Sequence, residues 1–142
     1  MKMKTGGILG LVGGIIMVVA GITAFFAGTI LQAEASLLGV TLPASLIADP
    51  LYGVPAAITL VLAIIAIIGG VIGMKGTKAG GALCLIAGII VIVGVFIPIA
   101  AVGSYVVSGV TIPVTIHLTS TFYIDGLLAI VGGIGVFTAR NQ

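Results

Sequence analysis

Apolar residues gather in four long runs, at residues 6–30, 54–74, 79–103 and 122–139, and none of them contains Lys, Arg or Glu. Each run is close to the ~20 residues that a helix needs to cross ~30 Å of hydrocarbon. The first is too long for the 7–15-residue core of a signal peptide, so we expect it to remain as a span. Helices satisfy their own backbone hydrogen bonds in lipid. The pattern therefore predicts an all-α membrane protein, a four-transmembrane-helix bundle in a single membrane domain, residues 1–142.

The few charged residues predict the orientation of these spans. Lys2 and Lys4 precede the first run, Lys75 and Lys78 lie between the second and third, and Arg140 follows the fourth. The acids Glu34 and Asp49 lie in the link between the first two runs, and Asp125 begins the fourth. Basic residues favour the cytoplasmic side of a membrane. We therefore expect a multi-pass protein of the cell membrane with both termini in the cytoplasm.

Three short strings occur twice in the same order. Residues 4–16 (KTGGILGLVGGII) resemble 78–90 (KAGGALCLIAGII), residues 39–43 (GVTLP) resemble 109–113 (GVTIP), and residues 66–70 (AIIGG) resemble 129–133 (AIVGG). An ordered set of matches indicates a duplication, here of a helix–loop–helix unit, residues 1–74 and 75–142. Because each unit has two spans, the two repeats run parallel, related by an axis along the membrane normal. Chance similarity between glycine-rich helices is the alternative.

The string Lys-x-Gly-Gly-x-Leu-x-Leu that opens both units is similar to small glycine-rich four-span membrane proteins of archaea and bacteria. This resemblance covers mainly the helices and implies four spans without a stated activity. Claudins and tetraspanins share the span count only, because this chain has one Cys and no Trp.

Glycine and alanine recur at helical spacing within the runs. Small residues let helix backbones approach closely in lipid, where hydrophobic burial does not drive helices together. We expect helix-packing roles for Gly7, Gly14, Gly21, Gly28, Gly70, Gly80, Ala87, Gly88, Gly94 and Gly133. These residues serve packing within the chain or, alternatively, contact with another subunit.

The link after the third run changes to a period of two. Val110, Ile112, Val114, Ile116 and Leu118 alternate with more polar residues, which predicts a strand with one apolar face. The similar residues 39–43 predict a shorter strand that pairs with it in a small outer β cap. The residues expected in this cap are Gly39, Thr41, Pro43, Gly109, Thr111 and Pro113. Pro98, late in the third run, is expected to loosen the outer end of that helix.

Composition narrows the chemistry. Hydrophobic residues make up 61% of the 142 residues and charged residues 6%, against roughly 25% charged in soluble domains. The net charge of +2 gives no basic patch for nucleic acid. His117 is the only histidine and is expected on an exposed strand position, and the lone Cys84 is expected to pack as a small apolar residue. We expect no cofactor, no metal and no catalytic site.

Asp125 is the acid nearest to a membrane run. Carboxylates inside a membrane often mark ion or proton paths. Because Asp125 falls only a few residues inside the outer end of the fourth run, we expect an interfacial, hydrated or helix-start role at the outer interface. Near a helix start its negative charge would be favourable. The chain looks a little like a rotary-ATPase proteolipid, but its long, partly apolar links argue against that family.

These observations favour a non-enzymatic structural or scaffolding membrane protein. It is expected to form a homo-oligomer or to join a larger membrane complex through Gly/Ala helix faces and the outer cap. A small channel or transporter is the second hypothesis, although charge is lacking inside the spans. A membrane-coat protein of a virus or vesicle is the third.

Overall fold

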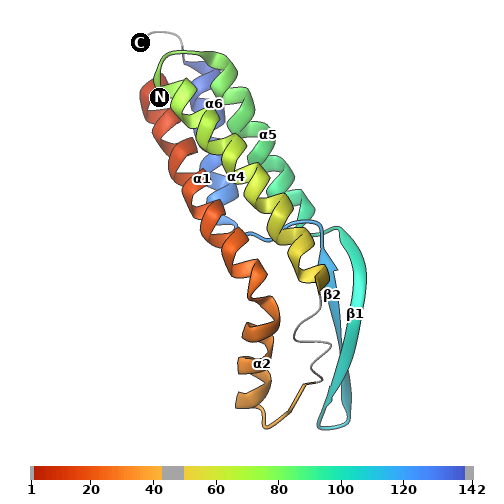
Figure 1. Ribbon diagram of the computed structural model, residues 1–142. Coiled ribbons are helices and arrows are strands. Elements are labelled where there is room, and N and C mark those ends of the chain that lie inside the picture. The colour runs from red at the N-terminus through yellow and green to blue at the C-terminus, as the bar shows by residue number, and fades with distance from the viewer. Residues whose placement is uncertain (1, 43–49, 140–142) are drawn as a thin grey trace.

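The computed structural model describes residues 2–42 and 50–139 and is mostly helical. Four helices lie side by side: α1 (Met3–Phe25), α4 (Gly53–Met74), α5 (Lys78–Gly94) and α6 (Ile124–Thr138) (Figure 1). Both α1 and α5 pack along α4 and α6, whereas α1 and α5 barely touch each other. The four helices therefore surround a common core, with α1 diagonally opposite α5. We call them the helical body.

Two ends of the helical body can be distinguished in Figure 1. The start of α1, the end of α6 and the turn from α4 to α5 lie at one end, which we call the terminal end. A further helix, α2 (Ala27–Leu37), and a two-stranded sheet project from the other end, which we call the hairpin end. A short 3₁₀ helix, η1 (Pro50–Tyr52), leads into α4.

Helix length separates the four helices into two pairs. By length and composition, α1 with 23 residues and α4 with 22 are apolar and long enough to cross a membrane. The apolar helices α5 and α6 have 17 and 15 residues. At 1.5 Å per residue they extend about 26 Å and about 22 Å, less than the hydrocarbon thickness of ~30 Å.

The end of α5 corrects the predicted third span. The helix ends at Gly94, and Pro98–Val107 forms the strand β1, so the prediction of a helix through residue 103 is wrong. Proline has no N–H for a helical hydrogen bond and disfavours the helical conformation in the residue before it. An apolar run of this kind does not by itself distinguish a helix from a buried strand.

The sheet is an antiparallel hairpin of β1 and β2 (Val110–His117). Ser108 and Gly109 form the two-residue turn with φ of 52° and 82°, as a type I′ turn requires. The strand predicted over 110–118 is thus confirmed, with Thr111 and Pro113 in it. Pro113 pairs with Ser104, a tolerated place in a sheet whose two strands are both edges.

Of residues 39–43, which were predicted to pair with β2, residues 39–42 do not pair with it; its partner is β1. Gly39, with φ of 75°, ends α2, and Val40, Thr41 and Leu42 form no strand. Pro43 lies outside the described residues. Leu42 and Ala35 instead pack against Tyr105 and Val114 of the hairpin. The strand β2 takes its partner from residues 98–107 because these directly precede it in a tight hairpin, whereas α2 occupies the corresponding part of the first link.

Glycines form the contacts between helices in the body. A Cβ atom added at Gly7 would lie 2.5 Å from the backbone nitrogen of Met74, and one at Gly14 would lie 2.9 Å from that of Ile67. Real Cβ atoms do not approach backbone so closely, so these positions require glycine. Comparably tight contacts within the chain surround Gly21, Gly70, Gly80, Gly88, Gly94 and Gly133, while Gly28 and Ala87 are buried.

Several of these contacts occur in matched pairs. Gly6 faces the Gly132 oxygen and Val136 nitrogen, as Gly80 faces the Gly69 oxygen and Gly73 nitrogen. Gly7 faces the Gly70 oxygen and Met74 nitrogen, as Gly81 faces the Gly133 oxygen and Phe137 nitrogen. The α1–α4 and α5–α6 contacts therefore use the same atoms at corresponding positions, as do the α1–α6 and α5–α4 contacts.

Large apolar side chains point away from the body. On the four helices they include Ile15, Val19, Val61, Ile64, Ile86, Leu127 and Phe137, each about half exposed. The buried core contains Met17, Leu62, Ala63, Ala66, Ala87, Val91 and Ala129. Inside and outside thus differ in the size of the side chains more than in their polarity.

Candidate functional site

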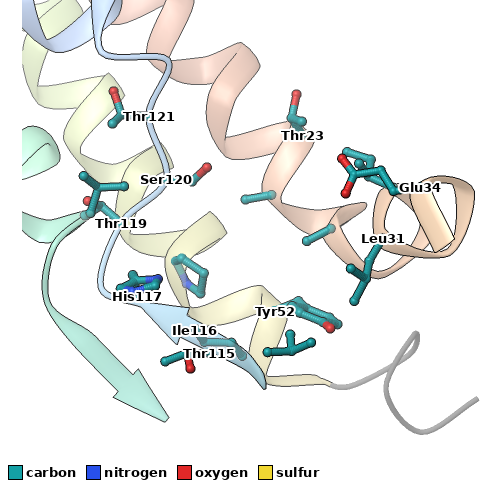
Figure 2. A pocket seen from close by; sticks show the side chains of 16 residues that line it. Thr23, Leu31, Glu34, Tyr52, Thr115, Ile116, His117, Thr119, Ser120 and Thr121 are labelled. Atoms are coloured by element: carbon teal, nitrogen blue, oxygen red, sulfur yellow. The ribbon is translucent and has the colours of Figure 1, made fainter. Parts of the chain in front are cut away.

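A cavity of about 420 Å³ opens at the hairpin end. It lies between the end of α1, α2, the start of α4, β2 and the segment 118–123 that joins β2 to α6. Figure 2 shows Thr119, Ser120 and Thr121 following one another along that segment, with Thr23 and Glu34 on helices of another wall. Tyr52 and His117 also line the cavity. An apolar space with a few polar side chains is typical of sites for small ligands.

Side-chain hydrogen bonds hold the segment 118–123 against the helices. The Thr119 hydroxyl donates to the Val91 carbonyl in the last turn of α5, at 2.7 Å. The Ser120 N–H donates to the Thr59 hydroxyl of α4 at 2.9 Å, and this hydroxyl donates to the Ser120 carbonyl at 3.2 Å. These bonds replace the backbone ladder that an irregular segment lacks, so hydroxyl residues are required here.

Asp125 lies just beyond this segment, in the first turn of α6. Its side chain is fully buried. The Oδ1 atom accepts hydrogen bonds from the Thr121 hydroxyl and from the Gly126 N–H, the latter at 2.8 Å. The Oδ2 atom is also buried and has no hydrogen-bond partner among the described residues. A buried carboxylate oxygen without a partner is energetically unfavourable, so it calls for a donor or a cation.

The position of Asp125 along the body follows from its contact with α1. A Cβ atom added at Gly13 would lie 2.7 Å from the Asp125 carbonyl oxygen. Gly13 is ten residues from Met3 and twelve from Phe25, close to the middle of α1. Since twelve helical residues extend about 18 Å, the Asp125 backbone lies about 18 Å along α1 from the end of that helix at Phe25. Of the roles expected for Asp125, the helix-start position agrees with the structure, and its side chain is buried there.

The remaining candidates for chemistry are placed apart from this carboxylate. His117 is half-buried at the end of β2 and lines the cavity, rather than standing exposed on the strand. Cys84 is buried, and its thiol contacts the Ala66 carbonyl at 3.3 Å. Within residues 2–42 and 50–139, no three His, Cys, Asp or Glu side chains come together as metal ligands.

The structure does not bring the predicted cap residues into the cavity. Gly109 and Thr111 lie at or beside the hairpin turn, and the cavity uses the other end of β2, residues 114–117. The sequence reasoning missed residues 119–121. The available signal was three hydroxyl residues in succession, the last of them four positions before the only acid of an apolar run.

Comparison of the chain with protein families, with curated proteins and with solved structures finds no match.

Proposed function

We propose that this chain is a non-enzymatic integral membrane protein in which α1, α4, α5 and α6 are four spans. The observation that carries this proposal is the arrangement of side chains by size, with glycine and alanine inside and large apolar residues outside. Water would penalise such an exterior, whereas lipid would not. The apolar residues Val95, Phe96 and Ile97 follow α5 and add to the apolar length of this short helix.

The charges support one orientation in the membrane. Lys2 and Lys4 lie at the start of α1, and Lys75 and Lys78 lie at the α4–α5 turn, all at the terminal end. Glu34 lies on α2 at the hairpin end. The positive-inside rule then assigns the terminal end to the cytoplasm and the hairpin end to the outer side.

The matched contacts support duplication. Two helix pairs that make the same atomic contacts at corresponding positions are expected when one unit has been used twice. The links differ, since α2 stands in the first and the β1–β2 hairpin in the second. In this proposal the helices keep the ancestral packing, and the projecting elements have diverged.

Self-association or entry into a larger complex is the role that we propose for the projecting elements. The glycine faces that were expected to meet other subunits are already filled by contacts within the chain. At the hairpin end, by contrast, Leu37 is 89% exposed and Val110 63% exposed. Exposed apolar side chains on elements that project beyond the lipid are suited to contact with another protein.

The mass of the protein in mild detergent tests this role. Native mass spectrometry should find an oligomer, and Leu37→Gln with Val110→Thr should shift it to the monomer. Ile15→Thr, a change to an exposed residue in the middle of α1, serves as the control and should keep the wild-type mass. A wild-type chain that is monomeric in detergent and after crosslinking in its native membrane would refute self-association. A shell-forming coat protein would instead give very large assemblies.

Transport is the second candidate, and one observation favours it. The cavity and its three successive hydroxyl residues lead from the hairpin end to a buried carboxylate deep in the body. Flux of a labelled solute into vesicles that contain the purified protein would support this candidate.

A further inference from the structure

The Asp125 carboxylate is half satisfied. Its Oδ1 atom receives two hydrogen bonds, while Oδ2 is buried without a partner in the described part of the chain. The lysines of the described part of the chain, Lys2, Lys4, Lys75 and Lys78, all lie at the terminal end, and His117 on the cavity wall makes no ion pair with this carboxylate. The only other acid among the described residues, Glu34, is exposed on α2. The side chain is therefore a single negative charge with no counter-charge from the described protein.

The helix packing itself has no need of this carboxylate. The register that matches Gly69 with Gly132 and Gly70 with Gly133 places Leu62 of α4 at the position that corresponds to Asp125. Leu62 is buried and belongs to the apolar core. At this position α4 packs into the body with an apolar leucine. Packing therefore does not explain why α6 has an acid there.

We infer that Asp125 is the anionic ligand of a monovalent cation site, for which Na⁺ is the best candidate. A single positive charge balances a single carboxylate. Na⁺ is a hard cation that suits carboxylate, hydroxyl and carbonyl oxygens, and the hydroxyl oxygen of Thr121 lies against this carboxylate. A transition metal prefers imidazole or thiolate ligands, and Ca²⁺ takes 6–8 oxygens, often from several carboxylates. The described residues offer neither set near Asp125.

Thr121 provides the connection between this carboxylate and the outside. It lines the cavity, and its hydroxyl donates to Asp125 Oδ1 while accepting from the Tyr123 N–H at 3.0 Å. The site is thus one side chain away from a cavity that is open at the hairpin end. A cation that enters there passes Glu34 on the cavity wall, whose charge favours cations over anions.

Equilibrium binding of ²²Na⁺ to the purified protein in detergent tests this inference directly. Wild-type protein should bind Na⁺ saturably in choline buffer. Asp125→Asn retains acceptor atoms for the bonds to Thr121 and Gly126 but removes the charge, and should weaken binding about tenfold or more. Thr121→Val should weaken binding to a smaller extent. Thr138→Val alters an exposed hydroxyl at the far end of α6 and should bind as the wild type does.

A melting curve of each protein in choline buffer shows whether it is folded. If Asp125→Asn fails to fold, the wild type and Thr121→Val still decide the question. Absence of saturable ²²Na⁺ binding by the wild type would overturn the inference, and this is the result expected if Oδ2 simply carries a proton. Unchanged binding by folded Asp125→Asn would overturn it as well. Neither result would affect the proposed membrane topology or self-association, which are measured separately.

Discussion

Glycine gives this molecule its close helix contacts by leaving out the Cβ atom. At Gly7 and Gly81 the missing atom would lie within 3 Å of backbone atoms of the neighbouring helix. Such contacts maximise dispersion between backbones, which is the main source of helix association where the solvent is lipid. The same residue type has another use at Gly109, where the positive φ of the hairpin turn favours it.

Substitution of Gly7 by Ala should measure how much the close contact between α1 and α4 contributes to stability. The added Cβ atom would lie 2.5 Å from the Met74 nitrogen and 2.7 Å from the Gly70 oxygen, so α1 and α4 would have to move apart. We expect Gly7→Ala to lower the free energy of unfolding by about 1–3 kcal/mol. Gly53→Ala is the matched control, because among the residues that the structure places its Cβ atom would meet the Phe25 ring alone, at 3.8 Å. Denaturant titration in detergent measures both, and equal effects would argue against close packing at Gly7.

The Thr59 hydroxyl is the second position where a single residue should matter. Thr59→Val removes both bonds between α4 and Ser120 and leaves the backbone N–H and carbonyl of Ser120 without that partner. A loss of about 1–3 kcal/mol in unfolding free energy is expected. In Thr23→Val, the lost hydroxyl has the Val19 carbonyl of its own helix as its one partner among the described residues, so a change below about 0.5 kcal/mol is expected. A thermal melt that ranks the two variants in the reverse order would contradict this assignment.

At the scale of elements, the hairpin depends on its turn. Both central residues have positive φ, which a β-branched side chain at Gly109 would strain. Gly109→Val should therefore destabilise β1 and β2 locally, by about 1 kcal/mol or more. Ser108→Asn should have the opposite effect, because Asn tolerates this conformation better than Ser. Hydrogen exchange of the hairpin amides should become faster in the first variant and slower in the second, with α1 unchanged in both.

The sequence predicted the elements whose patterns are local. The alternation from Val110 to Leu118 was sufficient for β2, and an uninterrupted apolar run was sufficient for α4. The strand β1 was missed because residues 95–103 continue the apolar run of α5. What makes them a strand is Pro98 together with pairing to β2, and pairing is a contact between distant residues that no local pattern contains.

The site was harder to predict for a similar reason. Its cavity joins Thr23, Glu34, Tyr52 and the segment 115–121, which are far apart in the sequence. The depth of Asp125 depends on how far along α1 the helix α6 begins, and the contact with Gly13 sets that position. Spacing along the chain predicted the helix start correctly but gave no measure of burial.

The whole molecule has a polar–apolar order that differs from that of a soluble protein. Its interior is rich in Gly and Ala, with a few larger apolar side chains such as Met17, a few hydroxyls and one carboxylate. Its exterior along the helices is rich in Ile, Val, Leu and Phe. Polarity hardly distinguishes the two sides of each helix, so a search for amphipathic helices would miss the core. The lysines of the described residues lie at the terminal end and Glu34 at the hairpin end, which gives the molecule a direction along the helix axes.

That direction yields a prediction about topology. Cys84→Ala removes the only cysteine at a position whose counterpart in α1 is Gly10, so a small residue should be tolerated there. In this background, Thr111→Cys places a thiol on the exposed hairpin, and Lys75→Cys places one at the exposed α4–α5 turn. A membrane-impermeant maleimide should label the first in intact cells and the second only after permeabilisation. This expectation rests on both the positive-inside rule and the assignment of four spans. Labelling of both thiols from the same side of the membrane would refute the four-span assignment. Labelling of Lys75→Cys in intact cells, and of Thr111→Cys only after permeabilisation, would refute the orientation alone.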